Sequence, residues 1–97
     1  MIPNDVTAFI ARRFPPAHHE SATALLSTAT LENGTLATAR LVRCAAVASG
    51  GSLERLAAEV ARLKVDWRDV VVAGEYEVID GTLERVRDLN DPIAGDF

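Results

Sequence analysis

The chain has 97 residues, with 10 lysines and arginines against 14 aspartates and glutamates, and 48% of its residues are hydrophobic. This length supports one hydrophobic core, so we expect a single domain covering residues 1–97. No apolar run reaches the roughly 18 residues that a membrane-spanning helix needs. Acidic residues outnumber basic ones most strongly after Gly74, which argues against nucleic acid and anionic membrane surfaces as partners.

The N-terminal residues do not form a basic segment followed by an apolar one, so we expect no signal peptide and a cytoplasmic location. The single cysteine, Cys44, cannot make an internal disulfide bond and lies in the most apolar part of the sequence. It is therefore predicted to be a buried, unreactive thiol.

Two amphipathic helices are expected before residue 31. Asn4 can cap the first helix, and Pro15-Pro16 ends it, because a residue that precedes proline is driven out of helical geometry. The second helix is expected over about residues 17–30. Its apolar stripe consists of Ala22, Leu25, Leu26 and Ala29.

The segment Leu36–Ser49 is expected to be the central, buried helix. Only Arg40 and Arg43 carry charge there, and their spacing of three places them on one helix face. The other residues are apolar nearly all round, which is typical of a helix that is packed on most sides. Gly50 and Ser52 then provide a left-handed C-cap and a new N-cap, as in an antiparallel helical hairpin.

Two further helices are predicted downstream. Between Ser52 and Lys64, apolar residues recur at the helical period, which indicates an amphipathic surface helix. The next helix is capped by Asp66, with Asp69 in the first turn beside the positive end of the helix dipole. We expect Trp67, on its apolar stripe, to belong to the core. Because valine-rich runs also suit strands, the helical assignment of Val70–Val72 depends on these caps.

The dipeptides Asn33-Gly34 and Asp80-Gly81 are strong signals for a β-hairpin, but a glycine is also common where a helix ends. At the first dipeptide we prefer a helix end followed by an N-cap at Thr35. At the second, the hairpin would pair Tyr76–Ile79 with Thr82–Arg85, and a helix end is only slightly favoured. Whether Val78–Arg85 forms a hairpin or a loop stays open.

The predicted fold is an all-α bundle of four to five short antiparallel helices with an extended acidic C-terminal tail. Pro92 and Gly95 exclude a long helix in the tail. Its apolar residues, Val86, Leu89, Ile93 and Phe97, would then lie along the bundle. The alternative is a small α+β fold with one C-terminal hairpin.

A sequence pattern runs through the central and later helices: an arginine in an apolar helix, then Gly-x-Leu-x-x-Leu, Asp-Trp-Arg-Asp-Val and Glu-Tyr. Its residues are Arg40, Gly51, Leu53, Leu56, Asp66, Trp67, Arg68, Asp69, Val70, Glu75 and Tyr76. The pattern resembles a set of short, uncharacterised bacterial proteins and covers less than half of the chain. The resemblance implies a helical fold and carries no known activity, so it transfers no functional residue.

No constellation of side chains points to catalysis, a metal or a cofactor. His18 and His19 are adjacent, so their side chains would diverge on a helix, and the spacing of a zinc-binding helix is absent. Asp66 and Asp69 are explained as a helix cap and a dipole partner, and the other acidic pairs do not share a helix face. We therefore assign no catalytic residue, no metal ligand and no cofactor.

The expected function is that of a small cytoplasmic interaction or adaptor module, which binds another protein or a second copy of itself. Trp67, Arg68 and Tyr76 are the candidate interface or ligand residues, because large amphipathic aromatics often anchor interfaces. The alternative is a small-ligand binder or an enzyme. It would gather polar groups and a carboxylate of perturbed pKa in a pocket near these three residues.

Overall fold

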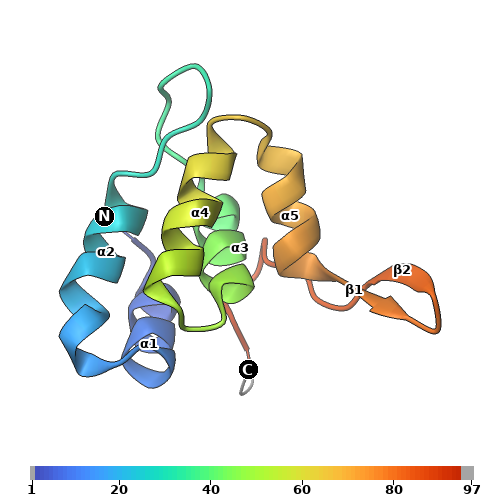
Figure 1. Cartoon of the computed structure of the whole chain (residues 1–97), viewed down its shortest axis with the longest axis horizontal. Helices are drawn as coiled ribbons and strands as arrows, with labels where there is room; N and C mark the ends of the chain where they lie inside the picture. The colour runs from blue at the N-terminus through green and yellow to red at the C-terminus, as the bar shows by residue number, and fades with distance from the viewer. Residues whose placement is uncertain (1, 95–97) are drawn as a thin grey trace.

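The computed structural model describes residues 2–94 and shows a bundle of short helices from which a hairpin projects (Figure 1). The helical segments are α1 (Asn4–Arg13), the 3₁₀ turn η1 (Pro16–His18), α2 (His19–Ser27), α3 (Ala39–Ser49), α4 (Leu53–Leu63) and α5 (Trp67–Glu75). The strands β1 (Tyr76–Ile79) and β2 (Thr82–Arg85) follow them. The chain is mostly helical, as predicted, with the terminal hairpin of the alternative α+β fold. Within the described residues, no helix combines the length and the apolar character needed to cross a membrane.

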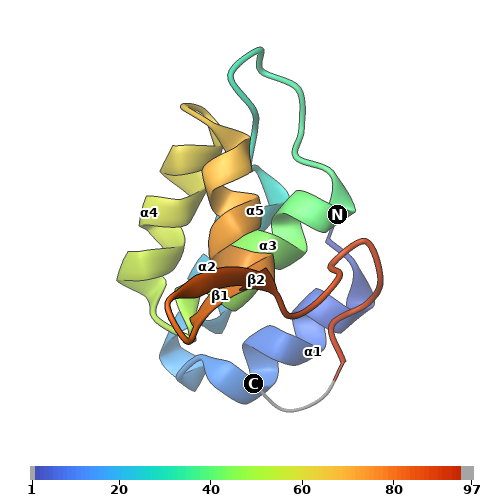
Figure 2. The same cartoon turned by 90° about the vertical axis from the view of Figure 1, so that its right-hand side faces the viewer.

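Helix α3 lies inside the bundle, where α5 and α4 are its most extensive neighbours (Figures 1 and 2). Its buried residues are Leu41, Val42, Cys44, Ala45, Ala46 and Ser49. The buried hydroxyl of Ser49 donates a hydrogen bond to the Ala46 carbonyl oxygen at 2.6 Å, so this polar group is satisfied. The predictions of a central buried helix and of a buried Cys44 are both confirmed.

Helices α3 and α5 approach closely because Gly74 has no side chain. A Cβ atom added to Gly74 would lie 2.7 Å from the Cα atom of Cys44, which is closer than packed atoms allow. The absence of that atom lets the two backbones meet. Glu75, the next residue along α5, is thereby held against α3.

Three of the predicted helix ends are formed by the expected residues. Ser52 Oγ accepts a hydrogen bond from the Arg55 amide at 3.2 Å, and Asp66 Oδ1 accepts one from the Arg68 amide at 3.1 Å. Gly50 ends α3 in the left-handed region, with φ of 61°. Helices α4 and α5 are therefore confirmed, including the valine-rich run of α5.

The central helix begins later than predicted. It starts at Ala39 instead of Leu36, and its N-cap is Thr38 instead of Thr35. The preceding residues form an extended loop in which Thr30 pairs with Leu36 across the Asn33-Gly34 turn. The turn-forming tendency of Asn-Gly therefore outweighs the helical tendency of the residues that follow it.

The first two helices also differ in detail from the prediction. Helix α1 begins at Asn4 itself, with Pro3 at the N-cap and no side-chain cap. Helix α2 ends at Ser27, three residues earlier than expected, where the Thr28 hydroxyl donates to the Ala24 carbonyl oxygen at 2.9 Å.

The preference for a helix end at Asp80-Gly81 was wrong, and the hairpin is present with the strand limits that the alternative gave. Strands β1 and β2 pair antiparallel, with Ile79 opposite Thr82. Asp80 and Gly81 have φ values of 50° and 80°. Two successive positive values are what a two-residue hairpin turn requires, and Asp-Gly adopts them readily.

The residues after β2 return to the bundle without forming a helix, as predicted, but their extended course is interrupted by a turn at Leu89–Asn90. Leu89 is buried in the core. The Ile93 amide donates to Asp5 Oδ2 at 3.0 Å, which ties this segment to α1. The predicted contact of Phe97 lies outside the described residues.

Candidate functional site

Trp67 is the first residue of α5, and 45% of its surface is exposed. The prediction that it belongs to the core is therefore wrong. A side chain on the first turn of a helix has no preceding turn beneath it. The indole ring is covered only by the segments that lie beside it, and one part of it faces solvent.

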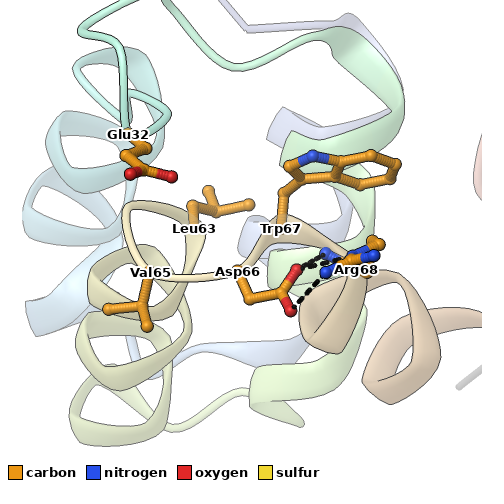
Figure 3. Close-up of a pocket in the computed structure, with 6 residues that line it drawn as sticks. All are labelled: Glu32, Leu63, Val65, Asp66, Trp67 and Arg68. Atoms are coloured by element: carbon orange, nitrogen blue, oxygen red, sulfur yellow. Dashed lines mark hydrogen bonds and ion pairs between the residues drawn. The ribbon is translucent and has the colours of Figure 1, made fainter.

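A hollow of about 260 Å³ lies between Trp67 and Glu32 (Figure 3). Leu63, at the end of α4, lies between these two side chains in the view of Figure 3. The remaining lining residues are Val65, Asp66 and Arg68, from the α4–α5 turn and the start of α5. Apolar side chains, two carboxylates and one guanidinium thus line the opening together.

Asp66 is already engaged by its own helix. Its carboxylate oxygens accept hydrogen bonds from Arg68 Nε at 3.0 Å and from Arg68 Nη2 at 3.1 Å. The side-chain hydrogen bond with Arg68 is the main reason why the pKa of Asp66 is lowered from its ordinary value. Asp66 is therefore ionised at neutral pH, and a general acid would need the opposite shift.

Two more hollows meet at Trp67. One, of about 420 Å³, is lined by Leu31, Glu32 and Asn33 from the extended loop before α3. The other, of about 350 Å³, is lined by Leu31, Thr38, Arg40 and Leu41. Trp67 borders all three hollows, so its ring is the element that they share.

Tyr76 is not part of this site. It follows the last residue of α5, whereas Trp67 is the first residue of that nine-residue helix. Since a helix rises by about 1.5 Å per residue, the two aromatic residues are about 13 Å apart along the axis. The structure places Trp67 and Arg68 at one end of α5, and Tyr76 packs against the core at the other end.

A second polar centre, which was not predicted from the sequence, is formed around Glu75. This side chain is fully buried and forms a bidentate pair with Arg40, whose Nε and Nη2 atoms both lie 2.9 Å from its oxygens. Arg85 Nε donates to Oε1 at 3.0 Å, and the Leu89 amide donates to Oε2 at 3.1 Å. One carboxylate therefore joins α5 to α3, to β2 and to the C-terminal segment.

The chemistry of this centre is that of a structural ion cluster. Hydrogen bonding from Arg40 lowers the pKa of Glu75 and outweighs the effect of burial. The Cys44 thiol lies 3.7 Å from Oε2, and burial together with the charge of Glu75 raises the pKa of the thiol to about 12. Neither group is prepared for proton transfer or nucleophilic attack at neutral pH.

Arg43, on the same face of α3, forms a matching pair with Asp5 of α1. Its Nε and Nη2 atoms donate to the Asp5 carboxylate at 2.9 and 3.2 Å. Burial acts to raise the pKa of Asp5, but Arg43 and the Ile93 amide outweigh it, so the pKa is lowered. Each of the two arginines of α3 therefore holds a distant part of the chain in place.

Glu59 on α4 has one oxygen without a partner. Its Oε1 accepts from Arg62 Nη1 at 3.1 Å, but Oε2 is buried and has no hydrogen-bond donor among residues 2–94. The side chain borders a hollow of about 360 Å³ whose other residues are Ala48, Arg55, Ala58, Arg62 and Ala73. An unpaired buried carboxylate oxygen is costly, so a donor at this position would be favourable.

The histidines lie apart from these centres. His19 Nε2 is 2.8 Å from the carbonyl oxygen of Phe14, so this ring connects α2 to the end of α1. Among the described residues, no three histidine, cysteine, aspartate or glutamate side chains are grouped closely enough to hold a metal ion.

Comparisons of the chain with protein-family models, with curated proteins and with solved structures find no match.

Proposed function

We propose that this protein is a small cytoplasmic protein–protein interaction module, in which Trp67 is the main contact residue for a partner. The observation that carries the proposal is the half-exposed indole ring at the junction of three hollows. Tryptophan is among the residues most often found at the energetic centre of protein interfaces. The adjoining Leu31 and Leu41 would form the apolar floor against which a partner side chain packs.

The charged groups near Trp67 support recognition over catalysis. Asp66 is paired with Arg68, and Arg40 is paired with Glu75, so these four charges are balanced within the chain, and Glu32 at the rim of the hollows carries the remaining charge. The pKa of Asp66, which lines one of the hollows, is lowered, whereas a catalytic acid would need a raised pKa. The surface left for a partner is therefore mainly apolar, with hydrogen-bonding groups at its edge.

The proposal is tested by affinity capture from the native cell extract, with Trp67→Ala as the test variant and Val72→Ala as the matched control. Val72 is also an exposed apolar residue of α5, but it does not line the three hollows. Proteins that use the proposed site should be retained by the wild type and by Val72→Ala and lost with Trp67→Ala. Circular dichroism of both variants checks that they are folded.

Binding by each captured protein is then measured with the purified pair. The chain contains one tryptophan, so its intrinsic fluorescence reports directly on this site. Burial of the indole ring under a partner should shift the emission to shorter wavelength. Capture that is unchanged by Trp67→Ala, or binding that leaves the emission spectrum unchanged, would refute the role of Trp67.

Small-ligand binding is the second candidate function, and the unpaired oxygen of Glu59 favours it. The hollow beside Glu59 also contains Arg55 and Arg62, so it offers both an acceptor and two cations. A small molecule that carries an ammonium group and a carboxylate fits this combination. Thermal-shift measurements with free amino acids, on the wild type and on Glu59→Gln, test this function, since only the wild type should be stabilised.

A further inference from the structure

The β1–β2 hairpin projects away from the helices, so both of its faces are accessible along much of its length (Figures 1 and 2). Val78 is 71% exposed and Leu83 is 52% exposed, and these two residues are opposite each other in the register. Two-stranded hairpins are only marginally stable when isolated. The exposed apolar pair Val78–Leu83 is a surface that no other part of the described chain covers. It lies at the opposite end of α5 from Trp67.

The two faces of the hairpin differ in character. Side chains of paired residues project to the same face, and successive residues alternate between faces. One face therefore carries Tyr76, Val78, Leu83 and Arg85, and the other carries Glu77, Ile79, Thr82 and Glu84. The first face is mainly apolar, and the second carries two carboxylates.

The carboxylates of the second face oppose each other. Glu77 is the register partner of Glu84, and like charges directly across an antiparallel pair are destabilising. Arg87 Nη2 donates to Glu77 at 2.6 Å. Among residues 2–94, Glu84 makes no ion pair. A cation supplied from outside the chain would therefore find an unbalanced carboxylate here.

The free edges of the hairpin expose backbone groups beside the apolar pair. The Val86 amide donates to the Glu75 carbonyl oxygen at 2.8 Å, so the opposed residues Glu75 and Val86 form a hydrogen-bonded pair at the base of the hairpin. Hydrogen-bonded and non-hydrogen-bonded pairs alternate along an antiparallel ladder, so the pair Val78–Leu83, three positions further along, is not hydrogen-bonded. The backbone N–H and C=O groups of these two residues therefore point outward, away from the partner strand. No backbone hydrogen bond from elsewhere in residues 2–94 reaches them.

We propose that this hairpin binds a strand of another protein in which apolar residues alternate with lysine or arginine. The added strand would extend the sheet by backbone hydrogen bonding at an edge. Its apolar side chains would continue the face of Val78 and Leu83, and its cations would continue the face of Glu77 and Glu84. The alternation follows from the period of two in a strand.

A second copy of this chain is a poorer occupant than a basic strand. The net charge is −4, and a second hairpin would bring further carboxylates to the same face. The two basic residues in and after β2 are already engaged, Arg85 by Glu75 and Asp88 and Arg87 by Glu77. Charge complementarity therefore selects a basic partner.

Fluorescence anisotropy with a labelled peptide of about eight residues, a typical strand length, tests the proposal. The probe alternates valine with lysine, and its control has the same composition with the lysines and valines in separate blocks. The alternating peptide should bind more tightly than the block peptide. Hydrogen exchange should show new protection of the outward amide of Val78 or Leu83 only with the alternating peptide.

Variants of the chain then separate charge from sheet formation. Glu84→Gln should weaken binding about two- to fivefold, as expected for one exposed ion pair. Leu83→Thr keeps strand propensity and should weaken binding about tenfold through lost apolar contact. Glu54→Gln, an exposed carboxylate of α4, is the matched control and should bind like the wild type. If Leu83→Thr disturbs the hairpin, Glu84→Gln still provides the test.

Three results would overturn the proposal. Equal binding of the two peptides would mean that acidic charge alone attracts the lysines, and failure of both to bind would remove the site. A concentration-dependent dimer that Leu83→Thr abolishes would assign the hairpin to a second copy. Trp67→Ala should leave peptide binding unchanged, so this proposal and the proposed function at Trp67 can fail separately.

Discussion

Replacing Glu75 with glutamine should destabilise the chain by far more than a typical change on its surface. The substitution keeps the shape of the side chain but removes the charge that Arg40 and Arg85 share. The Leu89 amide would still find an oxygen acceptor. The bidentate pair with Arg40 would be lost, because an amide group presents an N–H₂ where the second oxygen was.

The expected magnitude follows from the contacts and their exposure. A hydrogen bond to a charged group contributes about 1.5–3 kcal/mol, and breaking a buried ion pair costs about 3–5 kcal/mol. The side chains of Arg40 and Arg85 are 33% and 41% exposed, so solvent screens part of the attraction and can hydrate them after the change. We therefore expect a loss of about 2–3 kcal/mol, which lowers Tm by about 10–20 °C in a domain of this size.

The assay is urea unfolding followed by far-UV circular dichroism and by tryptophan fluorescence. Trp67 lies at the opposite end of α5 from Glu75, so its emission reports unfolding of the bundle without direct contact with the substitution. Glu77→Gln is the matched control, because Glu77 is an exposed glutamate two residues away that also pairs with an arginine. Its loss should stay within about 1 kcal/mol.

Equal destabilisation by the two substitutions would refute the reasoning, since it would mean that burial does not distinguish these carboxylates. An unchanged midpoint for Glu75→Gln would show that the cluster around Glu75 adds nothing to stability. Hydrogen exchange adds a local criterion. The Val86 and Leu89 amides, which both bond to Glu75, should lose more protection in Glu75→Gln than the core amides of α3.

Three other predictions concern stability. Leu56→Ala should cost about 2–5 kcal/mol, because Leu56 is fully buried, and an unchanged thermal melt would remove it from the core. Gly74→Ala should cost about 1–3 kcal/mol through its clash with Cys44, and Ala73→Ser at an exposed neighbouring position should cost less than about 1 kcal/mol. The pKa values of Glu75 and Asp5 are lowered from 4.5 and 3.8, so the stability they contribute is complete above those values and lost as pH falls through the folded-state pKa values. Acid titration of unfolding should show this loss, with a shallower slope in Glu75→Gln.

The helices that could be predicted from the sequence are those whose signals are local. Ser52 and Asp66 bond to amides two or three residues ahead, and Gly50 adopts a conformation that its own chemistry permits. The burial of α3 was also predictable, because only two charged residues interrupt it. These features depend on spacing within one segment, and spacing is what a sequence displays directly.

The hairpin and the start of α3 were harder because one dipeptide can serve two structures. Asn-Gly and Asp-Gly both supply a residue with positive φ, which a helix C-cap and a hairpin turn each require. At Asp80-Gly81 the deciding factor is the pairing of β1 with β2 and the fixing of Arg85 by Glu75. That factor depends on residues distant in the sequence.

The positions of Trp67 and Glu75 could not be predicted from the sequence, for two different physical reasons. The periodicity of α5 placed Trp67 on the apolar stripe correctly, but periodicity does not say whether any segment lies over the first turn. The local sequence does not distinguish Glu75 from the other acidic residues, because its partner Arg40 is 35 residues away. The available signal was a carboxylate that closely follows the valine run of one helix, together with two arginines in an otherwise apolar helix.

Arg40 connects the two surfaces that we assign to partners. It lines one of the hollows beside Trp67, while both of its hydrogen bonds go to Glu75, which fixes β2 and the following segment. A partner that fills the hollow with an apolar side chain leaves this ion pair intact, so the hairpin keeps its position. A partner carboxylate in the same hollow would compete with Glu75 for Arg40 and loosen the hairpin. The apolar character of the hollow is therefore the condition under which the Trp67 surface and the hairpin bind their partners independently.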